Sequence, residues 1–104
     1  MRKITEESVN AFVNGKKFKK ANMEIEVIWN KISMYLHGNL IATLEGDHLY
    51  ITDAGWKSNT TKERLNGILD YFGLPGITQK NYVWYIGNKK WEGSYATNFK
   101  ECVK

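Results

Sequence analysis

The residue types best suited to binding chemistry fall in one stretch, Gly55 to Asn66. A glycine comes first and permits a backbone bend. A side-chain oxygen of Ser58, Asn59 or Thr60 can then accept an unpaired N–H from the first turn of a helix. Three cations are interleaved with these caps: Lys57, Lys62 and Arg64. The pattern predicts a helix start whose cations are exposed.

These cations lie near the positive end of the helix dipole, where they gain little stability unless an anion is bound. The stretch therefore predicts a site for an anion or a partner, made of Trp56, Lys57, Asn59, Thr60, Thr61, Lys62 and Arg64. It lacks the G-x-x-x-x-G-K-[ST] spacing of a phosphate-binding loop. The alternative is that Asn59 and Thr60 only cap the helix while Trp56 packs on a sheet.

A second group of candidates lies in an aromatic segment near the end of the chain. Tyr82, Trp84 and Trp91 alternate there with lysines at 80, 89 and 90. Rings interleaved with cations can stack on the bases of single-stranded nucleic acid, or form the hot spot of a protein interface. One face of this strand belongs to the core in any case, because successive side chains point in opposite directions.

Catalysis and metal binding are not indicated. The two histidines, His37 and His48, have no C-x-x-C or H-x-x-x-H spacing around them. No serine occupies a G-x-S-x-G turn. The single cysteine, Cys102, has no neighbour that would lower its pKa. We therefore expect no catalytic residues, no metal and no cofactor.

The net charge of +4 is concentrated at the N-terminus. Residues 1–20 hold six basic and two acidic side chains, and the nine basic and nine acidic groups that follow cancel. Four of these cations form a predicted basic loop: Lys16, Lys17, Lys19 and Lys20. Such a loop can attract nucleic acid or an acidic protein, although a merely solvated turn is the alternative. No apolar run reaches transmembrane length, and one cysteine fits a reducing cytoplasm.

Hydrophobic periodicity predicts an α+β fold in one domain. A short helix, with Thr5 as its N-cap, and the basic loop fill residues 1–22. Residues 23–53 alternate as four antiparallel strands in a meander. Residues 58–73 form one amphipathic helix packed on that sheet, and residues 77–93 form a small closing hairpin. The pattern fades over residues 94–104, which predicts a loosely held tail.

Several blocks of this chain resemble a family of short proteins encoded by tailed bacteriophages and prophages. They are Ala11-Phe12 with Gly15-Lys16, then Leu36-His37-Gly38-Asn39-x-Ile41-Ala42, then Ala54-Gly55-Trp56-x-Ser58-Asn59-Thr60-Thr61-Lys62-Glu63-Arg64-Leu65-Asn66, then Trp84-Tyr85 with Gly87-Asn88-Lys89-Lys90-Trp91-Glu92-Gly93. The likeness runs in order over about residues 10–93. Members of the family carry no assigned activity. The resemblance therefore implies a phage protein acting in the bacterial cytoplasm, and no mechanism.

Two functions are consistent with these features. The first is a non-enzymatic interaction protein that inhibits a host nucleic-acid machine, as anti-CRISPR proteins do. Its partner would be a host protein or ribonucleoprotein complex. The second is a small basic domain that binds nucleic acid directly. Membranes are not expected partners, and the sequence does not predict an oligomeric state.

Overall fold

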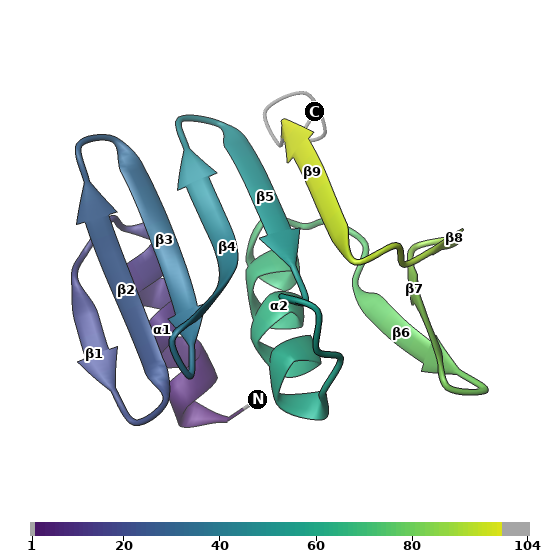
Figure 1. Cartoon of the computed structure of the whole chain (residues 1–104). Helices are drawn as coiled ribbons and strands as arrows, with labels where there is room; N and C mark the ends of the chain where they lie inside the picture. Colours follow the sequence, from purple (N-terminus) through teal and green to yellow (C-terminus); the bar gives the residue numbers. More distant parts are fainter. Residues whose placement is uncertain (1, 99–104) are drawn as a thin grey trace.

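The computed structural model describes residues 2–98 and contains two helices and two antiparallel sheets (Figure 1). The helices are α1 (Lys3–Val13) and α2 (Asn59–Tyr71). The large sheet has the order β1 (Phe18–Lys20), β2 (Met23–Ile28), β3 (Lys31–Leu36), β4 (Asn39–Glu45), β5 (His48–Thr52) and β9 (Ser94–Asn98). The small sheet has the order β6 (Ile77–Lys80), β7 (Val83–Ile86) and β8 (Lys89–Lys90). The fold is α+β, as the periodicity predicts.

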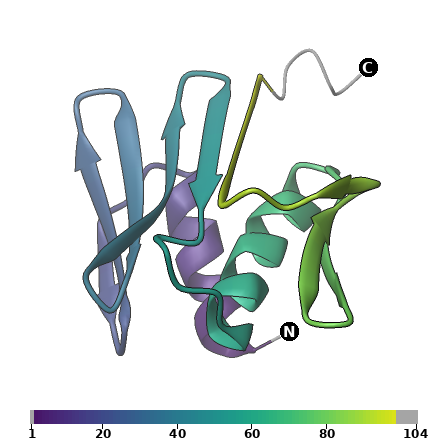
Figure 2. The ribbon, with the colours of Figure 1, turned by 45° about the vertical axis from the view of Figure 1, so that its right-hand side comes forward.

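Both helices cover the same face of the large sheet, and α2 lies between that sheet and the small one (Figure 2). Strands β2 to β5 alternate, so one row of apolar side chains faces the helices. The buried core draws on every layer: Phe12 from α1, Ile25, Met34 and Ile51 from the large sheet, Leu65, Ile68 and Leu69 from α2, and Trp84 from the small sheet. Neither helix has the length and apolar character needed to cross a bilayer within residues 2–98.

The four-strand meander over residues 23–53 is present as β2 to β5, with direct pairing of each strand to the next. The predicted basic loop is wrong in part, because residues 18–20 form β1 and pair with β2. The predicted loose tail is wrong for Ser94–Asn98, which pairs with β5 as an edge strand. Residues 99–104 lie outside the described part of the chain. The closing hairpin has a third strand, β8.

The first helix begins earlier than its sequence pattern indicates. Its N-cap is Arg2, whose carbonyl oxygen accepts the N–H groups of Thr5 and Glu6, so Thr5 is not the N-cap. The Thr5 side chain is fully buried and is engaged by the second helix instead. In α2 the cap is Ser58, whose Oγ accepts the Thr61 N–H at 3.1 Å. This selects one of the three caps that the sequence allows.

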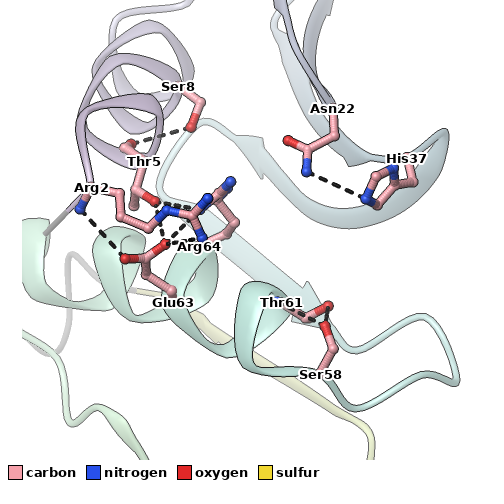
Figure 3. Close-up of polar contacts among 9 residues, drawn as sticks. All are labelled: Arg2, Thr5, Ser8, Asn22, His37, Ser58, Thr61, Glu63 and Arg64. Carbon is pink, nitrogen blue, oxygen red and sulfur yellow. Dashed lines mark hydrogen bonds and ion pairs between the residues drawn. The ribbon is translucent and has the colours of Figure 1, made fainter.

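Arg64 is not an exposed cation, which corrects the expectation from the sequence. Its side chain is fully buried between the helices (Figure 3). The guanidinium donates to Thr5 Oγ1 and to Glu63 Oε1, both at 2.6 Å. The Thr5 hydroxyl donates in turn to Glu63 Oε1 at 3.0 Å, and the Arg2 backbone N–H approaches Glu63 Oε2 at 3.4 Å. We call Arg2, Thr5, Glu63 and Arg64 the interhelix cluster.

The charges in the interhelix cluster shift two pKa values. Burial works to raise the pKa of Glu63, but the hydrogen bonds from Thr5 and Arg2 and the positive charges of Arg64 and Arg2 outweigh it. The result is a pKa below the ordinary value of 4.5. Burial lowers the pKa of Arg64, although a guanidinium remains protonated throughout the neutral range.

Replacing Arg64 should destabilise the protein strongly. Arg64→Ala removes the donor that joins α1 to α2 and leaves a void at a fully buried position. We expect the free energy of unfolding to fall by about 2–4 kcal/mol. Lys17→Ala, at an exposed site, should change it by less than about 0.5 kcal/mol. Urea denaturation followed by circular dichroism measures both, and a value for Arg64→Ala as small as that of the control would contradict this role.

Acid should weaken the same cluster. Because the folded pKa of Glu63 lies below its ordinary value, its contribution is complete above about pH 4.5 and is lost as pH falls through the folded pKa. Wild type and Glu63→Gln should therefore differ in unfolding free energy at pH 7 and converge as the pH falls through the folded pKa of Glu63. Urea titrations across this range test the sign. A difference that grows as the pH falls would show that the carboxylate is not stabilised by folding.

Candidate functional site

The loop between β5 and α2 is built around the buried side chain of Asp53. Its Oδ1 accepts the Gly55 N–H at 2.7 Å, and its Oδ2 accepts the indole N–H of Trp91 at 2.8 Å. Its backbone carbonyl accepts the Trp56 N–H at 2.9 Å. The backbone at Ala54 and Gly55 is left-handed, with φ of 57° and 80°. Asp53 therefore holds this turn in a defined shape and ties it to the segment after β8.

A second set of hydrogen bonds holds the same loop against Gly93, the residue just before β9. The Thr52 hydroxyl donates to the Gly93 carbonyl at 3.0 Å and accepts the Ala54 N–H at 3.1 Å. The Asp53 N–H also donates to the Gly93 carbonyl. Sequence reasoning missed this arrangement, although an Asp two residues before a glycine is a known signal for a side-chain-closed turn.

The loop held by these bonds carries an exposed indole, that of Trp56. The side chain of Trp56 is 74% exposed, so it does not pack on a sheet. It lines a hollow of about 400 Å³ between the β3–β4 turn and the first turn of α2. The lining residues are Leu36, His37, Asn39, Ile41, Asp53, Ala54, Trp56, Ser58, Thr60 and Thr61. We call this space the Trp56 hollow.

A second hollow of about 350 Å³ opens on the other side of the loop. Its lining comes from the start of α2 and from β6 and β7: Lys57, Ser58, Asn59, Gln79, Tyr82 and Trp84. Tyr82 is 93% exposed and occupies the two-residue β6–β7 turn, with φ of 66°. We call this space the Tyr82 hollow. The two hollows share Ser58 in their linings, with Trp56 in one and Tyr82 in the other.

Other predicted site residues have internal roles. Trp84 and Trp91 are buried, with ring centroids 6.2 Å apart, so neither ring is available at the surface for stacking. The Lys62 ammonium donates to Gln79 Oε1 at 2.9 Å and lies 5.8 Å from the centroid of Trp84. Lys62 thus joins α2 to the small sheet. Thr61 is buried and its N–H is taken by the cap.

The basic residues near the N-terminus lie away from this region. Lys19 and Lys20 belong to β1, and three strands separate β1 from β5 in the large sheet. At about 4.8 Å per strand, β1 is roughly 19 Å from β5. Lys20 also pairs with Glu7 of α1, at 3.0 Å. The structure therefore does not bring Lys16, Lys17, Lys19 and Lys20 together with Trp56 and Lys57.

The exposed cations at this end of the molecule form no ion pair with a carboxylate among residues 2–98. Lys57 and Lys80 are exposed, and Asp53 already accepts with both carboxylate oxygens. Within residues 2–98, no group of three or more His, Cys, Asp and Glu side chains is placed to hold a metal ion. The region offers aromatic stacking, positive charge and hydrogen-bonding groups, which is the chemistry of binding.

Removing the Asp53 carboxylate should lower the free energy of unfolding, because the β5–α2 loop loses its side-chain acceptor. Asp53→Ala leaves the buried indole N–H of Trp91 and the Gly55 N–H without their acceptor, and an unsatisfied buried donor costs about 1–3 kcal/mol. We expect a loss of about 2–3 kcal/mol in thermal or urea unfolding. Asp70→Ala, an exposed change near the end of α2, is the matched control. Equal stability of the two variants would contradict the proposed role of Asp53.

Comparison with known proteins places the chain in a phage family. No curated protein and no solved structure matches it. A family model described as Kyanoviridae Gp96 protein matches residues 1–102, nearly the whole chain. The chain therefore belongs to the Kyanoviridae Gp96 protein family, a family of phage proteins.

Proposed function

We propose that this phage protein acts by binding rather than by catalysis, and that it inhibits or redirects a nucleic-acid machine of the host. The observation that carries the proposal is the pair of exposed rings, Trp56 and Tyr82, beside Lys57. Trp, Tyr and cations are the residues that dominate binding hot spots. The host partner is a ribonucleoprotein complex in the bacterial cytoplasm.

The backbone that carries the rings is held in place before a partner binds. The backbone before Trp56 is fixed by Asp53 and Thr52, and Tyr82 sits in a turn of only two residues. Fixing the backbone of a loop before binding reduces the conformational entropy lost on association. Figures 1 and 2 place the β5–α2 loop and the β6–β7 turn at the same end of the molecule. A single partner surface can therefore contact both.

A CRISPR effector is the specific machine that we propose. This choice rests on analogy with other small phage proteins that block host defence, and fold does not decide it. The surface charge agrees with it in one respect. Lys57 and Lys80 are exposed, so this end is unsuited to mimicking the phosphates of duplex DNA and suited to contacting them, or to contacting acidic protein.

Alanine variants of the two rings should lose the partner without unfolding. Trp56→Ala and Tyr82→Ala remove exposed side chains, so stability should change by less than about 0.5 kcal/mol. Affinity should fall by about 2 kcal/mol or more if they form the hot spot. The measurement is capture of host proteins by the tagged chain, together with phage survival in cells carrying an active CRISPR system.

The matched control is Trp29→Ala. Trp29 is 94% exposed but occupies the β2–β3 turn, at the opposite end of the molecule (Figure 1). The Trp29→Ala variant should still capture host proteins and still protect phage. If Trp56→Ala and Trp29→Ala reduced capture equally, the surface formed by Trp56 and Tyr82 would be rejected as the binding site. A wild-type chain that captures nothing and protects no phage would reject the function.

Direct binding of nucleic acid is the second candidate, favoured by the cations around the hollows. Each phosphate neutralised on a single strand adds about −0.7 to the slope of log affinity against log salt. Lys57→Ala should therefore make the slope shallower by about 0.7, whereas Lys17→Ala, far from the hollows, should leave it unchanged. Fluorescence anisotropy at several salt concentrations measures both. If Lys17→Ala changed the slope and Lys57→Ala did not, the contact would lie at the segment just before β1 instead.

A further inference from the structure

The Trp56 hollow combines an apolar floor with an aromatic rim. Leu36 and Ile41 are buried beneath it, and Trp56 projects beside it. Ile41 reaches this position because the β3–β4 register shifts between Met34 and Tyr35, which buries Ile41 and Ala42 in succession. A volume of about 400 Å³ falls within the range of small-ligand sites. This shape suits a flat ring that can stack on the indole.

The rim of the hollow also carries polar groups that are not used inside the protein. The Asn39 amide and the Thr60 hydroxyl have no hydrogen-bond partner among the described residues, and His37 shares one ring nitrogen with the Asn22 amide at 3.3 Å. An aliphatic side chain entering the hollow would strip water from these groups without replacing its hydrogen bonds, which is costly. A flat ring with donors and acceptors on its edge would replace that water.

The charge around the hollow favours a phosphate beside such a ring. Lys57 directly follows Trp56, is exposed, and lines the neighbouring Tyr82 hollow. The one carboxylate in the lining, Asp53, is buried, with both oxygens accepting internal N–H groups. No free carboxylate of the lining would repel an anion. Ring stacking, edge hydrogen bonds and a cation together match a nucleotide.

We infer that the Trp56 hollow binds one unpaired nucleobase from the nucleic acid of the host machine, with the base against Trp56 and its phosphate beside Lys57. The base must be unpaired because a base within a duplex has both its faces stacked and its pairing edge occupied. This inference rests on the proposed function and names the part of the ribonucleoprotein that is recognised. Binding to duplex DNA is not expected at this site.

Tryptophan fluorescence tests the inference directly. In a Trp29→Phe background, Trp56 is the one exposed indole among residues 2–98, because Trp84 and Trp91 are buried. The probes are short single-stranded oligonucleotides of thymidine or adenosine, a duplex of mixed sequence, and an abasic strand of equal charge. We expect single strands to quench the emission, and the duplex and abasic strand to quench it much less.

Two substitutions identify the groups involved. Trp56→Ala should weaken binding of the single strand, followed by anisotropy, by roughly 5- to 150-fold, the range for loss of one base–aromatic stack. Thr60→Val removes only a hydroxyl and should weaken it several-fold. The matched control, Thr43→Val on β4 outside the hollow, should leave it unchanged. Circular dichroism establishes that each variant is folded.

The outcomes separate this inference from the proposed function. Quenching by the abasic strand equal to that by the intact strand would overturn the inference, because no base would be needed. The inference would also be overturned if capture of host proteins depended on Trp56 and resisted nuclease while oligonucleotides caused no quenching. That result would leave the proposed function in place. If quenching depended on the base but no host complex were captured, the result would support nucleobase binding at the Trp56 hollow and reject the proposed function.

Discussion

The structure depends on one buried cation. The guanidinium of Arg64 holds α1 to α2 through Thr5, and Glu63 balances its charge at the edge of the helix pair. Helices this short are marginal by themselves and need tertiary contacts to form. Leaving a buried charge unpaired is costly, so the bonds from Arg64 to Thr5 and Glu63 favour the alignment of the helices that brings these groups together, while Arg64 Nε has no hydrogen-bond partner within residues 2–98. The position of the α2 N-terminus, and hence of everything around it, follows from that alignment.

Asp53 connects this helix pair to the end of the chain. It fixes the loop before α2, and it accepts from Trp91, which follows the small sheet. Thr52 and Gly93 repeat the connection through the backbone, just before β9 pairs with β5. The small sheet is therefore attached to the large one beside the proposed binding surface. A partner that contacts both Trp56 and Tyr82 would bridge elements that the fold already holds together.

Much of the fold could be predicted from the sequence because its signals are local. The apolar stripe of α2 and the alternation of β2 to β5 depend on neighbouring residues alone. Strand β9 could not be recognised in this way, since Ser94 to Asn98 has little apolar alternation and is held by pairing with β5. The burial of Arg64 was equally hidden, because its acceptor Thr5 lies 59 residues away in the chain. The candidate site was predicted in part: Trp56 and Lys57 are exposed, whereas the exposure of an aromatic strand residue such as Trp84 depends on what covers it.

Exposure alone does not distinguish a binding residue in this molecule. Trp29 and Tyr82 are almost equally exposed, and both have left-handed backbones, which costs a non-glycine residue some stability. Departures from local preference that nothing in the fold compensates are expected at functional sites. The surroundings of these rings differ, however. Trp56 and Tyr82 each line a hollow at the start of α2, and the exposed Lys57 lines one of the two, whereas Trp29 lines neither hollow. A ring gains binding energy when its partner is enclosed on more than one side and water is excluded. That requirement, rather than the number of exposed rings, is why we propose a site at the end of the molecule where α2 begins.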